Sequence, residues 1–297
     1  MSKVVSANLY KSLVKRHREP NKKSTWHMLK EDYPELKRGC TLITRSGDWG
    51  ITREQQSTIS GKSKFFYRIE DASHGGSFLP LEIKSVKKHT KSWFTTNLYE
   101  NIGKNVYPLP LNIQKQSMSA ESLTEAKNEV DKDLLCVANF SITSPYRIRV
   151  AEWAWKNQED LGISCHFYER FEGQGEQLKM PFLSSIKLKP EIYAHNLARH
   201  QFCICPTGNG LDTYRMWECI LTNTVPIVQD SWMVRVFAKI WPMIIINRYE
   251  HSNLTLLMDT FFEKYGSISY DTDLLKEKYF ENLLDRIRYE SNRLRRQ

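Results

Sequence analysis

The chain has 297 residues, of which 40% are hydrophobic and 26% charged, a composition typical of a soluble globular protein with one large domain or two smaller ones. Its net charge of +9 suits an anionic partner, such as a phosphorylated ligand, a membrane surface or a nucleic acid, but no nucleic-acid-binding motif accompanies the basic clusters. The sequence has no run of ~18 apolar residues and no apolar signal-peptide core, so we expect no transmembrane segment and a cytoplasmic location.

The six cysteines support the same expectation. Most lie inside apolar stretches, and their spacing is not that of a disulfide framework, so we expect reduced thiols. Cys203 and Cys205 share one face if this stretch is a strand, but no CxxC pair accompanies them.

Residues 1–115 predict a first α/β lobe. Residues 40–44 and 64–69 have the apolar pattern of strands, and each is followed by a polar or glycine-containing loop, 45–50 and 70–76. Two shorter strands are expected at 92–95 and 106–109. Residues 116–133 are polar without apolar periodicity, which predicts a linker or an exposed helix.

Residues 134–270 predict a second lobe in which strands and helices alternate, as they do around a parallel sheet. Residues 271–297 predict a C-terminal helix able to pack back on the first lobe, because apolar residues recur there at helical spacing. In the second lobe the expected strands are 134–140, 163–168, 202–205, 225–228 and 243–246, and the expected helices are 145–156, 191–200, 213–222 and 231–240.

Residues 200–228 carry the strongest functional signal. A buried strand leads into a loop that begins at Pro206 and contains Gly208 and Gly210, and a helix opens near Thr213 and Tyr214. Glycines permit positive φ and close approach of the backbone to a ligand, and a helix N-terminus presents unpaired N–H groups. The combination predicts a binding corner for a diphosphate.

Two charged residues follow in the first turns of this helix. Arg215 can donate two hydrogen bonds to phosphate oxygens, and Glu218, on roughly the same face, can accept hydrogen bonds from ribose hydroxyls. The alternative is an ordinary ion pair at i, i+3 on the helix surface.

A second candidate for the donor site follows the first strand of the second lobe. Ser141 and Ser144 precede a helix that carries Arg147, and a serine-rich turn before a helix can bind a sugar or a phosphate. The alternative is a serine that caps the helix. Arg149 is a weaker candidate for the same role.

The segment FCICPTGNGLDTYRMWECILTNTVPIV resembles the C-terminal lobe of the exostosin-like glycosyltransferases, glycosyltransferase family 47. The resemblance implies an α/β, GT-B-like fold: two Rossmann-like lobes with a cleft between them. Pro206, Gly208, Arg215 and Glu218 match the family's motif, whereas Cys219 replaces its usual alanine and Asn223 its frequent glycine. Residues 41–52 and 91–113 resemble first-lobe segments of small viral and bacterial relatives, which implies work in the host cytoplasm if the chain is viral.

The resemblance further implies an inverting glycosyltransferase that transfers a sugar from a nucleotide-sugar, mostly a UDP-sugar, to a glycan acceptor. UDP-xylose, UDP-glucuronate and UDP-galactose all remain open as donors, and no cofactor is expected to be essential. Inversion needs a base that takes the proton of the acceptor hydroxyl. Asp71 and Asp48, in the expected first-lobe loops, are the candidates, with Trp49 and His74 as acceptor-binding residues; the alternative is that each aspartate caps a turn.

Three other interpretations carry less weight. Asp271 and Asp273 form a D-x-D pattern, but they directly precede the C-terminal helix, so we expect capping and no bound metal. A nucleic-acid-binding protein explains the charge but not the glycine loop. A dinucleotide-dependent oxidoreductase requires a third glycine that the loop lacks.

Overall fold

The computed structural model describes most of the chain from residue 40 onwards. Within that part, no helix is both long enough and apolar enough to cross a membrane. The described residues are 40–44, 65–71, 74–81, 90–98, 100–111, 119–169, 181–184, 187–208 and 210–297.

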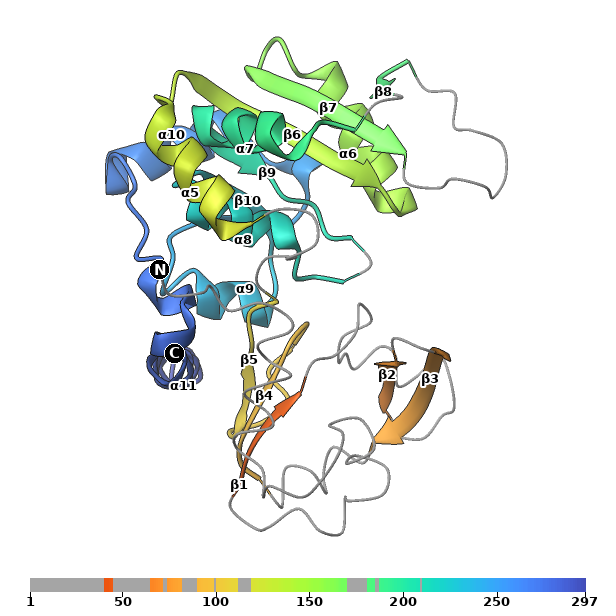
Figure 1. Cartoon of the computed structure of the whole chain (residues 1–297), viewed down its shortest axis with the longest axis vertical. Helices are drawn as coiled ribbons and strands as arrows, with labels where there is room; N and C mark the ends of the chain where they lie inside the picture. The colour runs from red at the N-terminus through yellow and green to blue at the C-terminus, as the bar shows by residue number, and fades with distance from the viewer. Residues whose placement is uncertain are drawn as a thin grey trace.

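The larger of the two parallel sheets has six strands in the order β11-β10-β9-β6-β7-β8 (Figure 1). The chain moves outwards from β6 to β8, returns to β9 beside β6, and moves outwards in the other direction, which is the doubly wound Rossmann order. The order therefore reverses between β6 and β9. The strands are β6 Leu134–Ile142, β7 Ile163–Glu169, β8 Leu183–Ser184, β9 His200–Ile204, β10 Val225–Gln229 and β11 Ile244–Ile246.

Helices cover both faces of this sheet. Successive side chains of a strand point to opposite faces, so each strand contributes buried residues to both sides. Val137 and Cys203 are buried with α5 (Ala120–Glu129), α7 (Pro190–Arg199) and α8 (Tyr214–Leu221). Their neighbours Cys136 and Phe202 are buried on the other face, with α6 (Pro145–Lys156) and α10 (Leu254–Tyr265). Helix α10 was not expected from the sequence.

The polar segment 116–133 contains a packed helix. Ser119 caps α5 by accepting a hydrogen bond from the Ser122 backbone N–H, and Ala120, Leu123 and Ala126 are buried. Helix α5 packs against α7 and α8. Of the two expected alternatives, a linker or an exposed helix, the helix is present, but it is packed and not exposed. Two of the three residues on its buried stripe are alanines, which add little hydrophobic signal to the sequence.

The first half contributes a three-stranded parallel sheet, β1-β4-β5, from Cys40–Thr44, Thr90–Thr95 and Val106–Pro108. A separate antiparallel hairpin is formed by β2 (Phe65–Asp71) and β3 (His74–Leu81). The loop expected at 70–76 was therefore too long, because strand pairing continues to Asp71 opposite His74. The expected α/β class is confirmed, with a parallel sheet in each half.

The C-terminal segment joins the two halves. It is not one continuous helix: short 3₁₀ turns at Asp273–Leu275 and Glu277–Tyr279 precede α11, Phe280–Leu294. Helix α11 packs against β5 and against α9, Trp232–Phe237. One apolar core contains Phe94 and Tyr107 of the first sheet together with Ile287 of α11, so the described parts of the halves share a core.

Candidate functional site

The expected diphosphate corner lies at the point where the strand order reverses. Strand β9 ends at Ile204, a loop follows, and α8 begins at Tyr214, while α6 begins directly after β6. In open parallel sheets, ligands bind beyond the carboxyl ends of the strands at such a reversal. The N-cap Thr213 makes no side-chain capping hydrogen bond, and the first turn of α8 contains no acidic residue, although Asp212 directly precedes the cap. The N–H groups at the start of this helix are therefore not capped by the Thr213 side chain.

Arg147 joins the two strand ends. Its Nη1 donates to the Ser141 carbonyl at 3.0 Å, its Nη2 to the Pro206 carbonyl at 3.2 Å, and its Nε to the Thr207 carbonyl at 3.1 Å. A guanidinium has five N–H groups, so two remain for another acceptor. Ser144 accepts from the Arg147 backbone N–H at 3.3 Å and so caps α6. The capping alternative for Ser144 is confirmed.

The Arg147 side chain leaves no room for a side chain at position 208, which is a glycine. A Cβ at this position would lie 2.9 Å from Nη2 and 3.2 Å from Cζ of Arg147, closer than atoms can approach without a shift. Gly208 does not have a positive φ, so positive φ is not the reason for a glycine at this position. The Gly208 backbone N–H donates to the Gly210 carbonyl at 3.0 Å.

Arg215 and Glu218 form a group with Tyr193 of α7. The Arg215 guanidinium lies 4.4 Å from the centre of the Tyr193 ring, and the Tyr193 hydroxyl donates to Glu218 Oε2 at 2.5 Å. Arg215 Nε lies 3.7 Å from the same Oε2. Burial raises the pKa of Tyr193, which keeps the phenol protonated as a donor.

The i, i+3 ion pair weighed as an alternative does form, but it is buried and does not lie on the helix surface. The side chains of Arg215 and Glu218 are only 15% and 9% exposed. Two buried nitrogens of Arg215, Nε and Nη1, have no hydrogen-bond acceptor. A buried charged donor without a hydrogen-bond acceptor is costly, so these two N–H groups are available to an acceptor on a ligand.

Arg147 is a second buried positive charge near Arg215. Burial, together with the positive charge of Arg215, lowers the pKa of Arg147 to about 10, so both guanidinium groups remain charged at neutral pH. Glu218 is the carboxylate in contact with Arg215. The group therefore favours an added anion such as a diphosphate.

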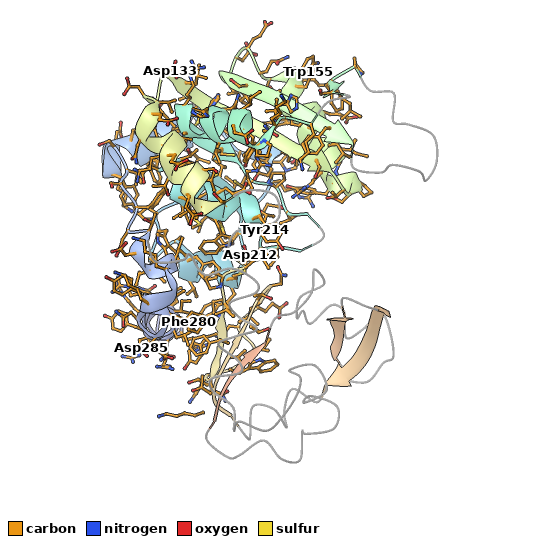
Figure 2. All side chains as sticks on the ribbon, viewed as in Figure 1. Asp133, Trp155, Asp212, Tyr214, Phe280 and Asp285 are labelled. Carbon is orange, nitrogen blue, oxygen red and sulfur yellow. The ribbon has the colours of Figure 1, made fainter. Side chains whose placement is uncertain are left out.

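Asp212 was not singled out from the sequence, yet it connects the halves. Figure 2 shows it between the two sheets, close to Tyr214. It accepts hydrogen bonds from the Leu111 backbone N–H at 2.5 Å and from Trp217 Nε1 at 2.7 Å, and its own N–H donates to Asn97 Oδ1 at 2.9 Å. An aspartate before a helix predicts only a cap, so its sequence context does not indicate these first-half partners.

The side chains of the expected catalytic and acceptor-binding residues lie outside what the structure describes. Asp48 and Trp49 fall beyond the described residues, and only the backbone of Asp71 and His74 is described, in the β2–β3 hairpin. The identity of the base therefore stays a prediction.

The expected capping role of the D-x-D aspartates is confirmed in part. Asp271 Oδ1 accepts from the Asp273 backbone N–H at 3.0 Å, but this bond lies at the start of a 3₁₀ turn whose N-cap is Thr272, and not at the start of α11. Asp273 pairs with Lys276, whose hydrogen bond holds the pKa of Asp273 below its ordinary value.

The basic C-terminal helix is largely paired within the chain. Arg286 and Arg293 lie near the buried Glu290, and Arg288 pairs with Asp285. Arg295 Nη1 donates to the Lys104 carbonyl at 2.9 Å. These arginines are therefore less available to a nucleic acid than the sequence alone indicates.

The sequence matches no protein-family model and no curated protein. Among solved structures, α,α-trehalose 6-phosphate synthase from Burkholderia multivorans is 12% identical, with 62% of this chain and 47% of that chain covered and a TM-score of 0.31. A chain of the GtfA/B complex is 9% identical, with 93% of this chain and 61% of that chain covered and a TM-score of 0.37. This chain thus spans roughly half to three-fifths of those chains. The similarity to these two structures is too low to indicate which reaction this chain performs.

Proposed function

We propose that this chain is a glycosyltransferase whose nucleotide-sugar donor binds beyond the ends of β6 and β9, with its diphosphate against Arg215 and the start of α8. The observation that carries the proposal is the pair of acceptor-free nitrogens on the buried Arg215, at the reversal point of a Rossmann sheet. A second buried guanidinium, that of Arg147, supports the same anionic ligand.

The proposed chemistry follows from these charges. The acceptor oxygen attacks the anomeric carbon as the bond from that carbon to the diphosphate breaks, and a base takes the hydroxyl proton. The leaving diphosphate gains negative charge, which fixed guanidinium groups and helix N–H groups stabilise without reorganisation. Asp71 and Asp48 remain the proposed bases.

The proposed donor class comes from the sequence. The segment containing Pro206, Gly208, Arg215 and Glu218 resembles the exostosin-like family, which mostly uses UDP-sugars and inverts the anomeric centre. We therefore propose a UDP-sugar, with UDP-xylose among the candidates, and a glycan acceptor. Glu218 is the proposed ribose contact, and in that role Tyr193 would fix its carboxylate by hydrogen bonding.

The first test is calorimetry of the full chain with UDP, GDP and NAD. We expect a nucleoside diphosphate to bind and NAD not to bind. Arg215→Ala should weaken nucleotide binding about 10- to 100-fold, because a hydrogen bond to a charged group contributes ~1.5–3 kcal/mol. A hydrolysis screen over a panel of nucleotide-sugars then identifies the sugar.

Arg235→Ala is the matched control. Arg235 also lies on a helix of the second half, but its side chain is 59% exposed and pairs with Asp230. Its loss should leave nucleotide affinity unchanged. The proposal fails if no uridine or guanosine diphosphate binds, or if a folded Arg215→Ala chain binds as tightly as the wild type.

A further inference from the structure

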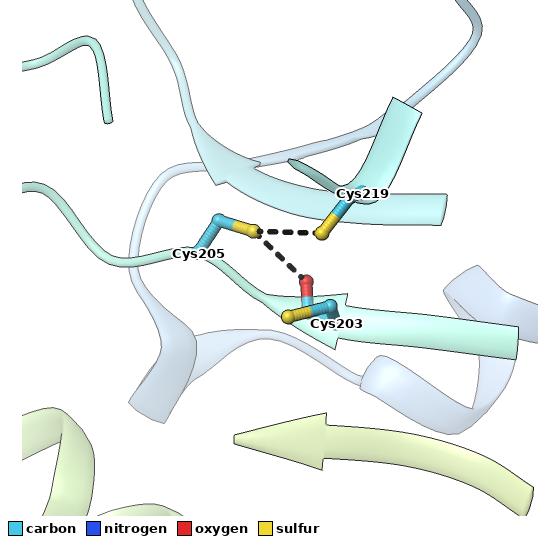
Figure 3. A group of neighbouring side chains, drawn as sticks. All are labelled: Cys203, Cys205 and Cys219. Carbon is cyan, nitrogen blue, oxygen red and sulfur yellow. Dashed lines mark hydrogen bonds between the residues drawn. The ribbon is translucent and has the colours of Figure 1, made fainter. Parts of the chain in front are cut away.

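Three cysteines meet in the core behind the glycine loop. Cys203 lies in β9, Cys205 directly follows that strand, and Cys219 lies in α8. Figure 3 shows the sulfurs of Cys205 and Cys219 facing each other, with Cys203 beside them. All three are buried, and their sulfur atoms lie within 4.8 Å of one another. The Sγ atoms of Cys205 and Cys219 are 3.7 Å apart.

We propose that these three cysteines, hereafter the thiol cluster, form a binding site for one thiophilic divalent cation in trigonal thiolate coordination. For a metal–sulfur bond of ~2.3 Å, three sulfurs around a trigonal ion are ~4 Å apart. The sulfurs of the thiol cluster already approach this separation. Thiolates are soft ligands and select soft ions.

Three thiolates carry a charge of −3, so a divalent ion leaves −1 in the site, whereas a monovalent ion would leave −2. Uncompensated charge is costly in a buried site, so the divalent ion is favoured. Zn²⁺ in structural sites takes four ligands, and the described metal-ligating side chains of this cluster supply three. Larger thiophilic ions such as Cd²⁺ are thus the better probe.

A bound ion would tie the strand that precedes the glycine loop to the helix that follows it. Cys205 is the residue before Pro206, and Cys219 is the residue after Glu218. The proposal does not require that the chain bind a nucleotide, and its test uses no substrate.

The test is a titration of the reduced, metal-free full chain with Cd²⁺, followed by ultraviolet sulfur-to-cadmium charge transfer and by elemental analysis after gel filtration. We expect one Cd²⁺ per chain. Cys203→Ala and Cys219→Ala should each weaken binding at least 100-fold. Cys165→Ala is the control, because Cys165 is a half-buried thiol of β7 outside the cluster, and it should bind like the wild type.

Cadmium X-ray absorption of the wild-type complex keeps the test decisive if a cysteine variant fails to fold. Three sulfur neighbours per Cd²⁺ support the site, as does a melting temperature that rises with Cd²⁺ concentration. The proposal is overturned if the wild-type chain shows no charge-transfer band, if the bound ion has mainly oxygen or nitrogen neighbours, or if folded Cys203→Ala and Cys219→Ala chains bind like the wild type. In those cases the three thiols are simply small buried apolar groups.

Discussion

Replacing Gly208 with alanine should destabilise the chain through Arg147. The new Cβ would lie 2.9 Å from Nη2, and that nitrogen cannot retreat freely because the guanidinium is fixed by three carbonyl oxygens. At least the hydrogen bond to the Pro206 carbonyl should break. A hydrogen bond from a charged donor contributes ~1.5–3 kcal/mol, so we expect Gly208→Ala to lower the free energy of unfolding by ~2–3 kcal/mol.

A double-mutant cycle isolates the cause. Urea denaturation is measured for Gly208→Ala, for Arg147→Ala and for the double variant. If the clash with Arg147 is responsible, the glycine substitution should have little effect once Arg147 is alanine, giving a coupling energy of ~2 kcal/mol. Gly266→Ala is the control: Gly266 has a φ of +61° and no atom within 4 Å of a new Cβ, so its backbone strain should add independently. An equal loss from Gly208→Ala in both arginine backgrounds would refute this explanation.

Substitutions at three further residues test other parts of the structure. Burial raises the pKa of Asp212 from 3.8 to about 7, so its contribution to stability is fully present below pH ~4 and is lost as pH rises through 7, at ~1.4 kcal/mol per pKa unit. Asp212→Asn should abolish that pH dependence in urea denaturation, and an unchanged slope would contradict the assignment. Tyr193→Phe keeps the ring beneath Arg215 but removes the hydrogen bond to Glu218, so unfolding should require ~1.5–3 kcal/mol less, while the exposed control Tyr289→Phe should change nothing. Asn223 has a φ of +54°, and its Oδ1 accepts a hydrogen bond from the Tyr270 backbone N–H at 3.1 Å. Asn223→Gly and Asn223→Ala both lose that hydrogen bond, so the difference between them isolates φ: the alanine variant should be ~1–2 kcal/mol less stable than the glycine variant, and equal melting temperatures for the two would show that φ is not the constraint.

The second half was the more predictable part because local patterns determine it. The helix expected at 145–156 matches α6 residue for residue, since proline and a serine cap mark its start. The buried strands that become β9 and β10 are short apolar runs between clear turn signals, and their expected bounds differ from the structure by one or two residues. The departure of Asn223 from the glycine of the resembled family also has a local reason: Asn is among the few residues that adopt a positive φ readily.

The contacts made across the fold were less predictable. Sequence spacing placed Arg215 and Glu218 on one helix face, but Tyr193, which contacts both, lies on another helix. Asp212 likewise depends on the Leu111 N–H, about one hundred residues earlier. Such partners are set by how strands and helices pack, and a single sequence without homologues has no local pattern that reports them.

The role of Arg147 shows why residue type and position are not enough to assign a ligand contact. An arginine in the first turn of a helix at the strand ends predicted a phosphate ligand, and the structure shows it bound to three carbonyls. The two interpretations differ in what the remaining N–H groups do. Arg147 has satisfied three of its five donors within the chain, whereas Arg215 has buried nitrogens without any acceptor. If a diphosphate binds here, Arg215 should therefore account for more of the affinity than Arg147, and Arg147 should act mainly by holding the loop in shape.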